Sequence, residues 1–105
     1  MALRFEYSAR ARIELIGVVH RIAERSPERA VRWSEGLNAR LETLNKFPRR
    51  CPVAAEFPSA ANPVRELTYG KRSPNVYRIF FQIEGDVVFI VSIRNSLQNS
   101  EGFEA

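Results

Sequence analysis

The first part of the chain passes from a strand-like to a helix-like pattern of apolar positions. Leu3, Phe5 and Tyr7 alternate with polar residues, which predicts a half-buried strand. Over residues 9–25 the apolar positions recur at steps of three and four, which predicts an amphipathic helix with Ser8 as its N-cap. The chain is therefore expected to begin with a strand that leads directly into a helix.

A second helix is expected after a short break at Ser26 and Pro27. Ser26 can cap it, and Pro27 can occupy its first position, where a missing N–H does no harm. The apolar stripe keeps helical spacing as far as Leu44, is extended by Phe47 and is ended by Pro48. Two helices joined by so short a break predict an antiparallel hairpin whose apolar stripes lie in the core.

The rest of the chain is read as a loop followed by strands. Four prolines lie within residues 48–63, so we expect a loop there, with a short strand or turn around 53–57. Residues 64–69 alternate weakly, and 76–83 are rich in β-branched and aromatic residues, so both are predicted to be strands. The nearly continuous apolar run over 87–93 is typical of a central strand covered on both faces.

These elements predict an α+β fold in one domain, residues 1–105. A length of 105 residues fits one domain, and an apolar content of 45% argues against a disordered chain. The helices are grouped in the first half of the sequence. We therefore expect the hairpin to pack on one face of a small sheet, made by the N-terminal strand and an antiparallel meander of about three strands.

Basic residues outnumber acidic ones by 16 to 12, and 14 of the 16 are Arg. The excess does not lie on the predicted sheet. Residues 1–51 carry 11 basic and 6 acidic groups, a balance of +5, whereas residues 52–105 carry 5 and 6, a balance of −1. A solvated helix face or a contact with a partner explains an excess on the helices, so net charge alone is weak evidence for a nucleic-acid target.

Several classes of protein are disfavoured by what the sequence lacks. Cys51 is the only cysteine, which excludes an internal disulfide and a multi-cysteine metal site. His20 is the only histidine and lies in a predicted helix, so a serine hydrolase has no suitable base. No signal peptide, Gly-rich phosphate loop or membrane-length apolar run is present. We expect a soluble cytoplasmic protein without a metal, cofactor or membrane partner.

Candidate chemistry is concentrated in the basic residues of the predicted sheet. After residue 51 these are Arg65, Lys71, Arg72, Arg78 and Arg94. Within 76–83, Tyr77, Ile79, Phe81 and Ile83 should face the helices, so Arg78 should point to the opposite side. There it can converge with Arg65 and Arg94 into a clamp for phosphate, if the strand register allows. The alternative is a set of ordinary solvated charges paired with Glu66 and Glu84.

Three segments together resemble the RelE/ParE superfamily of type II toxin–antitoxin toxins. Residues 64–72 and 76–83 are similar to the strand region of that superfamily, and residues 47–56 resemble the "CPxAPE" loop of one of its branches. The order of the predicted elements agrees over nearly the whole chain. The resemblance implies a small twisted antiparallel sheet with the helical hairpin on one face.

The resemblance also implies how such a protein acts. A cognate antitoxin encoded beside it would wrap and neutralise the toxin and repress the shared operon, so the toxin would reach operator DNA only indirectly through the antitoxin. Systems of this kind serve in plasmid stabilization. Free toxin would stop growth either by cutting messenger RNA in the ribosomal A site, as RelE-like members do, or by poisoning DNA gyrase, as ParE-like members do.

Carried over by position, Arg65, Arg78 and Arg94 would be the catalytic residues and would contact phosphate. Lys71 and Arg72 are further candidates for contacts with RNA. The tail of this chain lacks the His, the second Arg and the terminal Tyr of the strongest nucleases. Cleavage of RNA needs a base and an acid besides charge stabilisation, and Arg is a poor base. Three interpretations stay open: a metal-independent endoribonuclease, a gyrase inhibitor, and a non-toxic binding module that retains only antitoxin binding.

Overall fold

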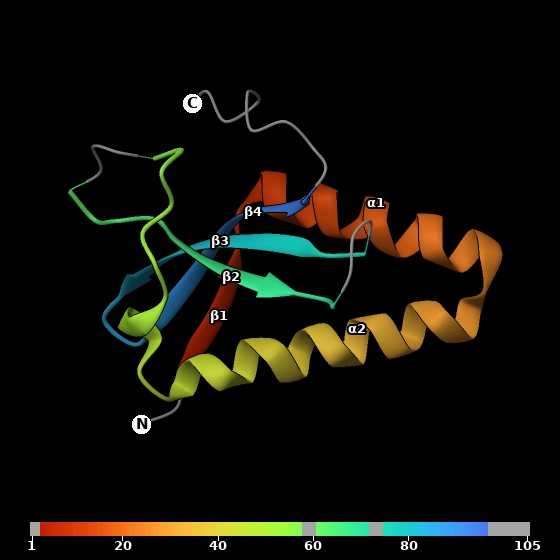
Figure 1. The fold of residues 1–105 in the computed structure, drawn as a ribbon, viewed down its shortest axis with the longest axis horizontal. Helices are drawn as coiled ribbons and strands as arrows, with labels where there is room; N and C mark the ends of the chain where they lie inside the picture. Colours follow the sequence, from red (N-terminus) through yellow and green to blue (C-terminus); the bar gives the residue numbers. More distant parts are fainter. Residues whose placement is uncertain (1–2, 58–60, 72–74, 97–105) are drawn as a thin grey trace.

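The computed structural model describes residues 3–57, 61–71 and 75–96, and these form two helices against a four-stranded sheet (Figure 1). The elements in chain order are β1 (Arg4–Tyr7), α1 (Ala9–Arg25), α2 (Pro27–Glu42), the 3-10 turns η1 (Thr43–Asn45) and η2 (Pro48–Arg50), β2 (Arg65–Tyr69), β3 (Tyr77–Glu84) and β4 (Val87–Asn95). The predicted α+β class is confirmed, as is the order of strand, hairpin and meander.

The sheet has the strand order β1-β4-β3-β2, so β4 is a central strand, as its apolar run predicted. The β2–β3 and β3–β4 pairs are antiparallel, but β1 runs parallel to β4, with Arg4 opposite Val87. The sheet is therefore mixed, which corrects the expectation of an antiparallel sheet. A parallel pair needs a long crossover connection, and here the two helices, the 3-10 turns, β2 and β3 together form it.

Both predicted helix starts are confirmed by their caps. The Ser8 hydroxyl accepts a hydrogen bond from the Ala11 N–H at 2.9 Å and donates one to the Val91 carbonyl at 2.9 Å. Ser26 caps α2 by accepting from the Arg29 N–H at 3.2 Å, and Pro27 is the first residue of that helix. Ser8 thus both starts α1 and fastens it to β4.

The main core lies between the hairpin and one face of the sheet. The helices contribute Ala11, Val18, Leu37 and Leu41, and the sheet contributes Leu67, Tyr77, Ile79, Phe81, Ile83, Val88, Ile90 and Ile93. The predicted helix-facing side of β3 is therefore confirmed. Leu44, within η1, is buried in the same cluster.

Phe47 does not lie in this core, contrary to the prediction from the helical stripe. The α-helix ends at Glu42 and the chain tightens into η1, so the helical spacing no longer points toward the sheet. Phe47 itself has a φ of 53°, in the left-handed region, and its side chain is 79% exposed.

A smaller second core covers the opposite face of the sheet. Ala54, Val64 and Phe80 are buried there, with Phe57 and Val91 packed against them. Val53 forms a β-bridge with Arg65, which confirms the short extended segment expected around residues 53–57. The loop after η2 therefore folds over the face of the sheet that the helices leave open.

A close approach between α2 and β2 occurs at Gly36. The Tyr69 hydroxyl donates to the Trp33 carbonyl at 2.7 Å, and a Cβ on Gly36 would collide with that hydroxyl. Gly17, in α1, has room for a Cβ, which would lie 3.5 Å from its nearest neighbour, the Arg21 side chain.

We expect opposite effects of alanine at the two helical glycines. Gly17→Ala should raise the free energy of unfolding by about 0.5–1 kcal/mol, because alanine favours the helix. Gly36→Ala should lower it by about 1–2 kcal/mol, because Tyr69 must shift and lose its hydrogen bond. Chemical denaturation measures both, and adding Tyr69→Phe should recover part of the loss at Gly36. Equal effects at the two positions would contradict the observed packing.

Candidate functional site

Arg78 lies on β3, on the side of the sheet away from the helices, as predicted, and is held by two carboxylates. Its Nε and Nη2 donate to the two oxygens of Glu66 at 2.9 and 2.8 Å, and its Nη1 lies 2.7 Å from Glu56 Oε2. The guanidinium also stacks on Phe80, 4.8 Å from the ring centroid. The contact with Glu66 is bidentate, a geometry that fixes both side chains.

This triad, defined as Arg78, Glu56 and Glu66, is mostly shielded from solvent. Its side chains are 24%, 16% and 20% exposed, respectively. The hydrogen bond from Arg78 holds the pKa of Glu56 below its ordinary value. The hydrogen bond to Glu66 raises the pKa of Arg78 above its already high value, so this arginine cannot act as a base.

Arg65 fastens the loop to the edge of the sheet. Its Nη1 donates to the Arg49 and Cys51 carbonyls at 2.9 and 2.8 Å. These carbonyls belong to the chain that leaves η2, so Arg65 holds that turn against β2. The side chain is thus engaged within the protein.

Arg94 is directly opposite Arg78 in the β3–β4 register and is only 9% exposed. Its Nε lies 3.9 Å from Glu14 Oε2 on α1. The other oxygen of Glu14 accepts from the Ser92 hydroxyl at 2.8 Å and the Ile93 N–H at 2.9 Å. β1 ends at Tyr7, which pairs with Ile90, so it does not extend alongside Ile93 of β4. The Glu14 carboxylate accepts the hydrogen bond from the Ile93 N–H in place of a strand.

The structure therefore brings two of the three predicted phosphate contacts together and sets the third apart. Arg78 and Arg94 face each other, whereas Arg65 is paired with Phe81. All three interact with groups of the protein itself. Of the residues expected to bind RNA, Lys71 is exposed in the turn after β2, and Arg72 lies outside the described residues.

Sequence reasoning did not identify Glu14 or Glu56 as partners of the arginines. Glu66 was weighed as a partner of the sheet charges, and it does pair with Arg78, but Glu84 is exposed and forms none of the ion pairs identified among the described residues. A signal for the pairing of Glu66 with Arg78 lies in the strand register. Glu66 stands two residues before Thr68, the residue opposite Arg78, and is therefore a diagonal cross-strand neighbour of Arg78. Nothing local in the sequence places Glu56, because a loop brings it to the sheet.

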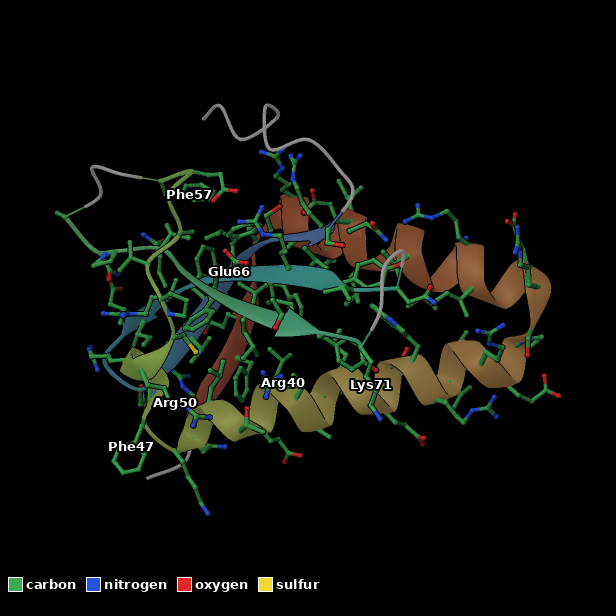
Figure 2. All side chains as sticks on the ribbon, viewed as in Figure 1. Arg40, Phe47, Arg50, Phe57, Glu66 and Lys71 are labelled. Atoms are coloured by element: carbon green, nitrogen blue, oxygen red, sulfur yellow. The ribbon has the colours of Figure 1, made fainter. Side chains whose placement is uncertain are left out.

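A pocket of about 420 Å³ lies beside the triad, between α2, η2 and the edge of β2. Its lining includes Arg40, Arg50, Cys51 and Thr68, and the Arg40 Nε donates to the Thr68 carbonyl at 2.9 Å (Figure 2). Burial raises the pKa of the Cys51 thiol, and the positive charges of Arg50, Arg40 and Arg65 offset only part of this. A raised pKa disfavours the thiolate, the form of cysteine that acts as a nucleophile.

An exposed aromatic and basic surface lies next to this pocket. Phe47, Pro48, Arg49 and Arg50 form it, and we call it the Phe47 surface. Figure 2 shows the ring of Phe47 projecting away from the helices and the sheet. A non-glycine residue in the left-handed region carries a conformational cost, and such strain is often kept at functional sites.

The described part of the chain lacks a membrane-spanning helix and a metal-binding cluster. No helix there is long and apolar enough to cross a membrane. Within residues 3–57, 61–71 and 75–96, no group of three or more His, Cys, Asp or Glu side chains is placed to hold a metal ion.

Comparison with known proteins identifies the class to which this hairpin-on-sheet fold belongs. A solved structure, a chromosomal ParDE toxin–antitoxin system from P. aeruginosa, superposes with a TM-score of 0.61 at 21% identity, covering 89% of this chain and 95% of that one. The chain therefore has the fold of that protein. A family model described as the ParE toxin of the type II toxin–antitoxin system parDE matches residues 5–99, so the chain belongs to the ParE toxin family. No curated protein matches it.

Proposed function

We propose that this protein, as a single toxin domain over residues 1–105, stops growth in the cytoplasm by binding and poisoning DNA gyrase. A cognate antitoxin neutralises it. Membership of the ParE family supports the toxin assignment. The observation that favours a protein target over RNA cleavage is the triad, in which the best candidate for a phosphate contact already binds two carboxylates.

Phosphate binding at Arg78 would be opposed by its neighbours. A phosphodiester approaching the guanidinium meets the negative charges of Glu56 and Glu66, and it must displace a bidentate partner to gain equivalent hydrogen bonds. Displacement would leave a partly buried carboxylate without its counter-ion, which is costly. Arg78 is therefore better explained as a structural residue than as a residue that stabilises a transition state.

The Phe47 surface has the composition of a protein-binding site. Aromatic and Arg side chains dominate the binding energy of protein–protein interfaces. Phe47 is exposed, and Arg49 and Arg50 are exposed beside it, which suits a partner surface with an apolar pocket and an acidic rim. A gyrase inhibitor needs such a surface and no proton-transfer groups.

Two assays run side by side test the proposal. The purified protein is expected to block supercoiling by gyrase and to leave messenger RNA intact in a coupled translation reaction. Cuts in the ribosomal A site with unimpaired supercoiling would instead support the endoribonuclease. If induction without antitoxin leaves colony counts unchanged, the protein is a non-toxic module that retains only antitoxin binding.

A further inference from the structure

The far end of the helical hairpin carries a basic hollow built from three parts of the chain. Arg21 and Arg25 come from the last turns of α1, Arg29 from the first turn of α2, and Asn75 from the segment before β3. Together with Ile22, these residues line an open hollow of about 290 Å³. We call these residues the hairpin-tip site.

The three arginines form no ion pair within the part of the chain that the structure describes. No carboxylate of the described residues lines the hollow. All three side chains are exposed. They differ in this respect from Arg78, whose charge is balanced by two glutamates.

The arrangement is electrostatically unfavourable in the free protein. Arg21 and Arg25 are four residues apart on one helix, a spacing at which like charges repel. Arg29 lies in the first turn of α2, where the helix dipole disfavours a cation, although Arg25 at the end of α1 is well placed. The exposed Glu24 and Glu28 on the same turns offset part of this repulsion, and an anion in the hollow would reduce it further.

We infer that the hairpin-tip site binds the phosphodiester backbone of a nucleic acid. Guanidinium forks match phosphate oxygens, and the Asn75 amide supplies a further donor. A polymer fits better than a small phosphate ester because the site is open and its arginines are exposed. Arg32 on α2 and Lys71 in the turn after β2 are also exposed and unpaired among the described residues, and their charges would add to the attraction for a polyanion.

The site is separate from the surfaces described above. Figure 1 shows the connection between α1 and α2 at one end of the molecule, with η1 and η2 at the other. A protein target at the Phe47 surface and a nucleic acid at the hairpin tip can therefore be bound together. The inference does not depend on gyrase being the target.

Binding of the purified full chain to labelled duplex DNA and to single-stranded RNA, both of mixed sequence, tests this site. The double variant Arg25→Ala/Arg29→Ala should weaken binding at least tenfold at low salt. It should also reduce the slope of log K against log salt by about 1.4–1.8, since each of the two lost phosphate contacts removes about 0.7–0.9. Circular dichroism should be unchanged because both side chains are exposed.

The matched control is Arg12→Ala/Lys46→Ala, which removes the same net charge from exposed basic side chains elsewhere. It should weaken binding less than threefold or so, since only long-range attraction is lost. Equal losses in the two double variants would overturn the site, because binding would then follow net charge alone. Absence of binding to both polymers by the unaltered protein would overturn it as well. A preference for one polymer identifies the source of the phosphates.

Discussion

Arg78→Ala is expected to lower the free energy of unfolding by about 2–3 kcal/mol, somewhat less than the cost of breaking a fully buried ion pair. The substitution leaves Glu56 and Glu66 facing each other without the guanidinium that both contact. It also removes the cation stacked on Phe80. Urea denaturation at neutral pH measures the loss. Arg12→Ala, at an exposed position without an ion pair among the described residues, should change stability little.

The pH dependence of this loss gives a second readout. Arg78 lowers the pKa of Glu56, so the pairing stabilises the fold above the ordinary carboxyl pKa of 4.5 and its contribution is lost as the pH falls through the lowered value. The difference between the unaltered protein and Arg78→Ala should therefore shrink in acid. A difference that persists undiminished at low pH would show that the effect arises from packing and not from charge.

Phe47→Ala is expected to reduce gyrase inhibition tenfold or more, the scale of a central aromatic side chain in a protein interface. Because Phe47 is 79% exposed, the fold should not be weakened. Phe47→Gly should even raise the free energy of unfolding by about 1 kcal/mol, since glycine adopts a φ of 53° without strain. Inhibition of supercoiling and chemical denaturation, measured on the same preparations, separate the two effects.

The matched control for this aromatic is Val31→Ala on α2. Val31 is also a large exposed apolar residue, at 57%, but it is outside the Phe47 surface. The Val31→Ala variant should therefore inhibit supercoiling as strongly as the unaltered protein. Loss of inhibition in both variants, or in neither, would remove Phe47 from the target interface. A loss of stability in Phe47→Gly would show that the left-handed conformation is not a strained one.

The helices and their boundaries could be predicted because their determinants are local. Ser8, Ser26 and Pro27 act on backbone groups within the next few residues, and the structure confirms all three. The same local reasoning failed at Phe47, where the helical period was continued past the end of α2. The change from α-helix to 3-10 turn depends on how the chain must leave the helix, which periodicity does not record.

Arg78 could be placed on the correct face of the sheet, but Arg65, which was expected beside it, lies opposite Phe81 of the helix-facing core, and the partners of the arginines were not foreseen. Alternation along β3 puts Arg78 opposite the helix-facing residues, and this is what the structure has. Its partners come from β2 and from a loop, and the partner of Arg94 comes from α1. Such contacts depend on strand register and on the path of the loop, which are set by the whole fold. For the same reason the parallel pairing of β1 was not foreseen.

The parallel pairing of β1 with β4 also has a consequence for synthesis of the toxin. β1 is made first, but its neighbour in the sheet begins at Val87, so the strand has no partner while the hairpin, β2 and β3 are being translated. Contacts so distant in sequence form late and slow folding. The sheet is completed only once β4 has left the ribosome, so a partly translated chain lacks the fastening of α1 to β4 through Ser8 and Glu14.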